Sequence, residues 1–229
     1  MENLDLIYAR FAAAHVRGTL SANLPRELRE KALEELSDGE LAELIRLGRE
    51  AELKLYRFKN THDLMPRVRR VIGYLRGQRF ESLLDVGSGR GVFLWPFLNA
   101  FPWADTLCLD LLDYRVQFLQ SVRDGGVTRL TALQGDLCHC PEIPDKSRDI
   151  VTLLEVLEHI PDTAAALRSA VRIARQALVI SVPNQPDNNP DHIHLFTRES
   201  LTKHLNEVGC NRLSFDAVPG HMLVFVQLP

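Results

Sequence analysis

The sequence has no long apolar run, few cysteines and no large excess of one charge. No uninterrupted apolar stretch approaches the roughly 20 residues that cross a bilayer, so we expect no membrane-spanning segment and a cytoplasmic protein. The net charge of −3 argues against non-specific attraction to nucleic acid or to anionic membranes. The spacing of the four cysteines matches neither a disulfide framework nor paired zinc-binding motifs, and we expect them to be reduced: Cys108, Cys138, Cys140 and Cys210.

The composition is that of an ordinary globular protein. With 229 residues, of which 45% are hydrophobic and 25% charged, the chain can form one sizeable core and a small appendage. Apolar residues recur at intervals of three and four near the N-terminus, which predicts helices over residues 11–18, 24–36, 39–58 and 64–77. We therefore expect residues 1–77 to form a helical cap that contacts the substrate.

The pattern of apolar residues changes after residue 78. Short β-rich runs alternate there with helical patterns, which favours a mostly parallel sheet with helices on both faces. The last two runs are joined by Pro219 and Gly220, which indicates an antiparallel hairpin at the sheet edge. The prediction is thus an α/β, doubly wound domain over residues 78–229, with strands in residues 82–86, 106–110, 130–136, 149–155, 177–183, 212–218 and 222–228.

A glycine-rich turn follows the first predicted strand. The segment LLDVGSGRGVFL, residues 83–94, ends a strand at Val86, turns through Gly87, Gly89 and Gly91, and begins a helix. Glycines let the backbone approach a ligand closely, and a helix N-terminus offers unpaired N–H groups. The spacing of two between glycines differs from the G-x-G-x-x-G fingerprint of nicotinamide dehydrogenases.

Two further carboxylates end the next two strands. Asp110 closes the second strand, where an acidic side chain can accept hydrogen bonds from ribose hydroxyls. Gly135 and Asp136 follow the third strand, where a carboxylate can accept a hydrogen bond from an adenine amine. Together with the glycine turn, these residues predict a pocket for an adenosine-containing ligand.

The order of these motifs, followed by DIVTLLEVLEH at residues 149–159, resembles the class I S-adenosylmethionine-dependent methyltransferases. The resemblance covers about residues 80–229 and implies a seven-stranded sheet whose final hairpin is reversed. It also implies that Asp85, Gly87 and Gly89 hold the methionine end of the cofactor, Asp110 the ribose, and Asp136 with Leu137 the adenine. The remaining residues of the predicted cofactor site are Ser88, Gly91, Leu111 and Glu155.

The fourth predicted strand delivers three polar residues to the same edge of the sheet. If the chain turns helical there, Glu155 and His159 lie four residues apart on one face, with Glu158 beside them. Two carboxylates and an imidazole can bind a divalent ion such as Mg²⁺, Mn²⁺ or Zn²⁺. The loop after the fifth strand presents His194, with His192 as a substitute, as a further ligand.

This cluster partly resembles two metal-dependent methyltransferase subfamilies, one acting on the ribose 2′-hydroxyl of small RNAs and the other on ubiquinone precursors. The resemblance implies metal ligation by Glu155, Glu158, His159 and His194, with Glu155, His159 and His194 as the catalytic residues. The same motif also occurs in methyltransferases without a metal, so metal use stays open. Lone histidines elsewhere, His221 among them, are expected to be structural.

The predicted function is O-methylation of a hydroxyl group on a small-molecule acceptor. An RNA 2′-O-methyltransferase and a non-catalytic cofactor-binding regulatory subunit are the alternatives. The intact set of cofactor carboxylates argues against the regulatory subunit, and an RNA-binding enzyme should carry a continuous basic path to its pocket. The oligomeric state and the identity of the acceptor do not follow from the sequence.

Overall fold

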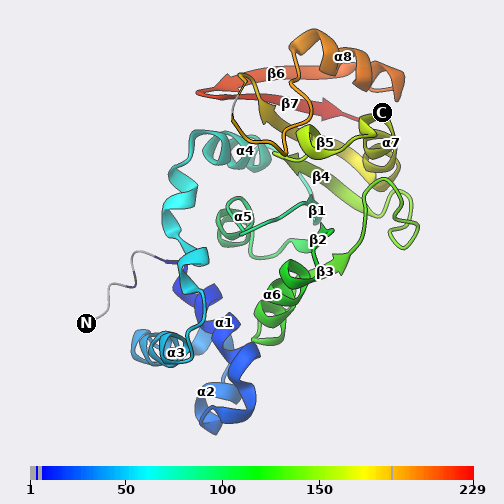
Figure 1. Cartoon of the computed structure of the whole chain (residues 1–229). Helices are drawn as coiled ribbons and strands as arrows, with labels where there is room; N and C mark the ends of the chain where they lie inside the picture. The colour runs from blue at the N-terminus through cyan, green and yellow to red at the C-terminus, as the bar shows by residue number, and fades with distance from the viewer. Residues whose placement is uncertain (1–3, 5–6, 187) are drawn as a thin grey trace.

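A seven-stranded sheet forms the centre of the protein (Figure 1). The structure, a computed structural model, describes residues 4, 7–186 and 188–229. The strand order is β3-β2-β1-β4-β5-β7-β6, and only the β5–β7 and β7–β6 pairs are antiparallel. The strands are β1 (Ser82–Val86), β2 (Asp105–Asp110), β3 (Leu130–Gln134), β4 (Arg148–Leu154), β5 (Ala174–Pro183), β6 (Arg212–Val218) and β7 (His221–Gln227). The predicted doubly wound sheet and its terminal hairpin are confirmed.

The topology fixes the place of the site. The chain runs outward from β1 through β2 to β3, then crosses back to β4 on the other side of β1. Ligands in open α/β sheets bind outside the carboxyl ends of the strands where this reversal occurs. The turns after β1, β2, β3 and β4 all open at that edge. The β6–β7 turn, at Pro219 and Gly220, reaches the same edge because β7 runs antiparallel to β5.

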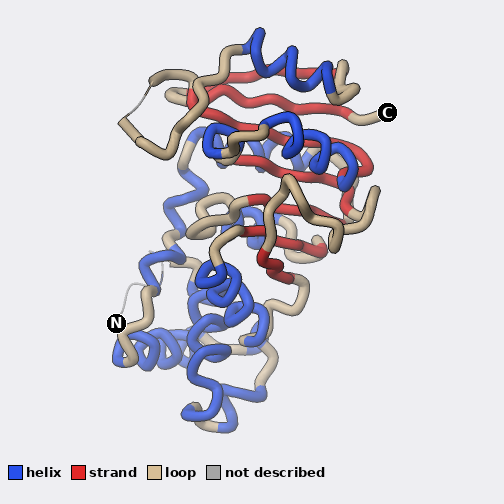
Figure 2. Tube along the Cα trace, turned by 45° about the vertical axis from the view of Figure 1, so that its right-hand side comes forward, coloured by secondary structure: helices blue, strands red, loops and turns tan. Residues whose placement is uncertain are grey.

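Helices cover both faces of the sheet, as Figure 2 shows. They form two apolar clusters with the alternating strand residues, one that includes Leu83 and Ile150 and one that includes Leu84 and Val151. The longer helices are α1 (Ala9–Leu20), α3 (Asp38–Glu50), α4 (Pro66–Arg76), α5 (Leu94–Ala100), α6 (Asp113–Asp124), α7 (Thr163–Ile173) and α8 (Arg198–Glu207). The shorter ones are α2 (Arg26–Glu30) and the 3₁₀ turns η2 (Ser21–Asn23), η3 (Leu33–Glu35), η4 (Leu55–Phe58), η5 (Asn60–Leu64) and η6 (Leu157–His159).

Two of the N-terminal helices are shorter than the sequence predicts. The helix expected over residues 24–36 ends at Glu30, because Lys31 is extended and its carbonyl accepts a hydrogen bond from Arg17. The helix expected over residues 39–58 begins at Asp38 with a Ser37 capping box and ends at Glu50. The helix predicted over residues 64–77 forms as α4. Residues 1–3, 5 and 6 of the predicted cap lie outside the described residues.

The N-terminal segment shares its core with the sheet domain. Helix α1 lies against α6 (Figure 1), and a Cβ atom added at Gly125 would lie 1.7 Å from the Ala14 carbonyl oxygen. Phe58 of η4 packs in the same aromatic cluster as Trp95 and Phe118. The described part of residues 1–77 therefore packs directly on the domain that follows it.

Within the described residues, the helices are all too short or too polar to cross a membrane. The cysteines Cys108, Cys138, Cys140 and Cys210 are free thiols, as expected.

Candidate active site

The turn after β1 requires glycine for steric reasons. Gly87 and Gly91 have φ angles of +65° and +82°, in the left-handed region that glycine tolerates. A Cβ at Gly87 would lie 2.9 Å from a methyl group of Val156, and one at Gly91 would lie 2.1 Å from the indole ring of Trp95. The Trp95 Nε1–H donates to the carbonyls of Arg57 and Arg90. Helix α5 begins at Leu94, two residues later than the sequence predicts.

Asp85 at the end of β1 keeps one carboxylate oxygen without a protein partner. Its side chain is 2% exposed, and Oδ1 accepts a hydrogen bond of 2.7 Å from the Thr152 hydroxyl. The structure gives Oδ2 no hydrogen-bond partner among the described residues. Burial raises the pKa of Asp85 to about 6. A buried oxygen of this kind needs a donor, which the ammonium group of a ligand can supply.

Asp110 at the end of β2 is also buried, and it organises the neighbouring turn. Its carboxylate accepts hydrogen bonds from the Leu112 and Gly89 amides at 3.0 and 3.4 Å, and from Arg115 at 3.4 Å. Beyond it, the Leu111 side chain is 62% exposed. The predicted carboxylate therefore stands at the predicted edge of the sheet, beside the glycine turn.

The residues after β3 complete this side of the site. Leu137 is buried, whereas the Asp136 side chain is exposed and accepts a hydrogen bond from the Cys138 amide. Both line one cavity of about 750 Å³. All but one of the predicted cofactor residues line it: Asp85, Gly87, Ser88, Gly89, Asp110, Leu111, Asp136, Leu137 and Glu155. Gly91 does not line it, but its neighbours Arg90 and Val92 do.

Glu155 pairs with Ser181 and His221 rather than with the polar residues that follow it. Its φ angle of +59° is unusual for a residue other than glycine, so the chain does not continue into the helix that the sequence predicts. Its Oε1 accepts from the Ser181 hydroxyl at 2.7 Å, and its Oε2 lies 3.0 Å from His221 Nε2. Burial works to raise the pKa of Glu155, but the hydrogen bonds from His221 and Ser181 outweigh it, and the pKa lies below its usual value.

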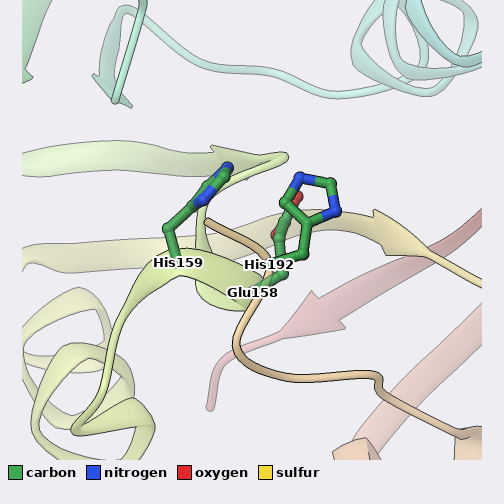
Figure 3. Close-up of side chains that lie close together, drawn as sticks. All are labelled: Glu158, His159 and His192. Carbon is green, nitrogen blue, oxygen red and sulfur yellow. The ribbon is translucent and has the colours of Figure 1, made fainter. Parts of the chain in front are cut away.

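Glu158, His159 and His192 come together as a group that can hold a metal ion (Figure 3). One potential ligand atom from each residue lies within 4.8 Å of the others. The Glu158 side chain is fully buried, and neither of its carboxylate oxygens has a hydrogen-bond partner among the described residues. Burial raises its pKa to about 8. His159 Nδ1 lies 2.9 Å from the Asp191 carbonyl oxygen, which leaves Nε2 for a ligand role.

His194 does not join this group. Its Nε2 lies 3.0 Å from the Ile160 carbonyl, and its amide donates to the Glu158 carbonyl. The adjacent Ile193 amide donates to the same carbonyl at 2.9 Å, which fixes the loop over the turn after β4. The four predicted ligands therefore do not converge: Glu155 faces His221, and His192, the substitute, lies beside His159 with a ring-centroid distance of 4.7 Å.

Sequence reasoning missed two residues of the site. His221 was expected to be structural, but it contacts Glu155, and Arg67, for which no role was expected, lines the cavity. The Pro219-Gly220 turn was a usable signal for His221, because the first residue of β7 must lie beside the last residues of β5. Arg67 carried no comparable signal, since three other arginines share its helix.

Residues 84–179 match the methyltransferase domain family. A ubiquinone biosynthesis O-methyltransferase of Neisseria meningitidis serogroup C is 25% identical over 167 residues, which are 70% of this chain and 67% of that protein. A protein of the same name from Vibrio cholerae is 27% identical over 52% of this chain and 48% of its own length. The chain thus spans between about half and two thirds of the length of these relatives.

A solved structure extends the likeness in fold. A methyltransferase from Aquifex aeolicus that depends on S-adenosylmethionine superposes with a TM-score of 0.60 at 16% identity, covering 75% of this chain and 94% of that one. The motifs at the strand ends, the matched domain, the relatives and the fold agree, and together they support a class I S-adenosylmethionine-dependent methyltransferase.

Proposed function

We propose that this methyltransferase transfers the methyl group of S-adenosylmethionine to a hydroxyl oxygen of a small-molecule acceptor. The observation that carries the proposal is the fully buried Glu158 carboxylate, whose oxygens lack hydrogen-bond partners among the described residues, beside His159 and His192. His159 also lines the cavity that holds the cofactor residues. An acceptor bound at these three side chains would therefore meet the methionine end of the cofactor.

The donor set fits a divalent cation. A buried carboxylate without partners is costly, and a cation satisfies it directly. One carboxylate and two imidazoles suit Zn²⁺ or Mn²⁺, and Mg²⁺ with added water ligands. We propose Glu158, His159 and His192 as the ligands, in place of the set that included Glu155 and His194. When bound, the cation would lower the pKa of the acceptor hydroxyl and hold its oxygen in line with the sulfonium methyl.

The other contacts with the cofactor and the acceptor would come from side chains of the protein. The orphan oxygen of Asp85 would accept from the ammonium group of the cofactor, Asp110 would bind the ribose, and Asp136 with Leu137 the adenine. Glu155 and His159 would face the acceptor from opposite sides of the turn after β4. In the transfer, the bond from sulfur to methyl would break and leave S-adenosylhomocysteine, a bond from oxygen to methyl would form, and the hydroxyl proton would pass to solvent water. We further propose that residues 1–77 act as a cap that contributes to the acceptor side of the cavity.

The names of the relatives support a small-molecule acceptor. The relatives named above are ubiquinone biosynthesis O-methyltransferases, a name that favours a small-molecule acceptor over RNA. A regulatory role without catalysis receives no support either, because the cofactor carboxylates and the glycine turn are all in place.

The test is methyl transfer to catechol, which presents two adjacent hydroxyls. S-adenosylhomocysteine formation is measured with wild type after treatment with a chelator, and again after Mg²⁺, Mn²⁺ or Zn²⁺ is restored. Glu158→Gln should lose the metal-dependent rate, while Glu43→Gln, at an exposed ion pair on α3, should keep it. A rate that the chelator does not change would remove the metal from the proposal. Absence of transfer to catechol and other hydroxyl acceptors would refute O-methylation.

A further inference from the structure

Two adjoining hollows lie at the edge of the sheet opposite the cofactor cavity. One, of about 700 Å³, lies between the end of α4 and the first residues of β4 and β5. The other, of about 530 Å³, lies beside the first residues of β1, β2 and β4. They share Glu81, Trp103 and Arg175, and none of their lining residues lines the cofactor cavity. This pair, called the amino-edge hollow, is therefore separate from the active site.

The amino-edge hollow is basic although the chain as a whole is acidic. Its lining holds five arginines and three carboxylates, a local net charge of +2, against −3 for the whole chain. Asp149 is already paired with Arg175 at 3.0 Å, and Asp105 is paired with Arg148. Three exposed arginines have no hydrogen-bond or ion-pair partner among the described residues: Arg76, Arg79 and Arg129. Three cations therefore stand against one remaining carboxylate, that of Glu81.

Buried groups fix a fourth arginine, Arg175, at the boundary of the two hollows. Asp149 and Ser82 are each 6% exposed, and the Asp149 carboxylate accepts from the Glu81 and Ser82 amides at 2.8 and 3.0 Å. Arg175 Nε pairs with Asp149, and Arg175 Nη2 donates to the Ser82 hydroxyl at 3.1 Å. Within the part of the chain that the structure describes, Nη1 of Arg175 has no partner. This guanidinium is thus oriented before a ligand arrives, which lowers the entropy lost on binding.

Trp103 presents an aromatic surface between these arginines. Its side chain is 55% exposed, it packs edge-on against Phe101 with a ring-centroid distance of 5.6 Å, and it lines both hollows. A planar base can stack on an exposed indole, and guanidinium groups bind phosphate oxygens through charge-assisted hydrogen bonds. A ligand that uses both features carries an aromatic base and several phosphate oxygens.

We propose that the amino-edge hollow binds a nucleoside polyphosphate. The base would stack on Trp103, and the phosphate oxygens would accept hydrogen bonds from the unpaired arginines and from Arg175 Nη1. Two hollows on either side of one indole suit one base and one polyphosphate chain. An RNA strand instead needs a basic groove that follows its backbone over about 4 or more nucleotides. The proposal does not depend on the proposed O-methylation, because the two sites share no residue.

The experiment is isothermal titration calorimetry with ATP and with tripolyphosphate, in the presence of a chelator. The protein is first saturated with S-adenosylhomocysteine, so that the cofactor cavity cannot take up the adenosine of ATP. The variants are Arg79→Gln, Arg129→Gln and Trp103→Leu. The control is Arg69→Gln, which removes an exposed arginine of α4 that lines neither hollow.

Wild type and Arg69→Gln should bind ATP equally. Arg79→Gln and Arg129→Gln should weaken both ATP and tripolyphosphate by about 3- to 10-fold, because each removes donors to phosphate. Trp103→Leu should weaken ATP by about 10-fold and leave tripolyphosphate unchanged, because it removes only the stacking surface. ATP should also change the tryptophan emission of wild type, and this change should disappear in Trp103→Leu.

Three results would overturn the proposal. The first is a saturated wild type that does not bind ATP, and the second is a set of variants that all bind ATP as tightly as Arg69→Gln does. The third is a single-stranded RNA hexamer that binds under conditions where ATP does not, which would assign the hollow to a nucleic acid. A loss of ATP affinity in Trp103→Leu without a loss of tripolyphosphate affinity would support the stacked base.

Discussion

Replacement of Glu158 by glutamine should stabilise the metal-free protein at alkaline pH. The Glu158 side chain is fully buried, and its pKa is raised from an ordinary value of 4.5 to about 8 by burial. Between these values the unfolded state is ionised while the folded state stays protonated, so the unfolded chain binds fewer protons and stability falls as pH rises. At about 1.4 kcal/mol for each pKa unit, this loss is at most about 5 kcal/mol by pH 8.

The assay is urea unfolding of wild type and Glu158→Gln in the presence of a chelator, at pH 5 and at pH 8. Glutamine has nearly the same shape and never ionises, so the two proteins should have similar free energies of unfolding near pH 5. At pH 8 the variant should be more stable by a few kcal/mol, although it loses the proposed metal site. If the difference between the two proteins is the same at both pH values, the burial argument for Glu158 is wrong.

Three further predictions concern the described contacts. His221→Phe removes the donor to Glu155 Oε2 and should cost about 1 to 3 kcal/mol of stability. The contact with Glu155 raises the pKa of His221, so wild type should lose this advantage as pH rises through the raised pKa. Free energies of unfolding measured for both proteins at pH 6 and pH 9 would reveal the loss. Gly125→Ala should destabilise the protein by about 1 to 3 kcal/mol or more, because the added Cβ would overlap the Ala14 carbonyl. Gly73→Ala, which has open space around its Cβ, should be neutral or stabilise the protein by about 0.5 to 1 kcal/mol. Thermal unfolding of both variants measures the difference. Asp110→Ala should weaken S-adenosylhomocysteine binding by about 10-fold or more in calorimetry, and unchanged binding would contradict the ribose role.

The strands and the positions of the carboxylates at their ends could be predicted because their signals are local. Each carboxylate directly follows an apolar run, and parallel strands in this topology bring their carboxyl ends to one edge. Asp85 and Asp110 therefore lie where the sequence places them. The glycine turn is equally local, since Gly87 and Gly91 are required by neighbours within a few residues or by the adjacent strand.

The acceptor side could not be predicted in the same way. The expectation that Glu155 and His159 lie on one face assumes a helix. Glu155 instead adopts a left-handed backbone conformation, which its residue type does not predict. The choice between His192 and His194 depends on which of two alternate residues in a proline-containing loop turns toward the site. The orientation of the loop is set by the Glu158 carbonyl, which accepts hydrogen bonds from the Ile193 and His194 amides. These residues lie 35 and 36 positions further along the chain. Such pairings are set by tertiary packing and have no local pattern.

The position of Trp95 against Gly91 makes its intrinsic fluorescence a probe of the glycine turn. The chain has two tryptophans, and Trp103 is 55% exposed, whereas Trp95 is fully buried against the glycine turn. An aqueous quencher such as iodide should therefore suppress the emission of Trp103 and spare that of Trp95. The emission that remains would report directly on the glycine turn, so that cofactor binding can be followed by intrinsic fluorescence without a label.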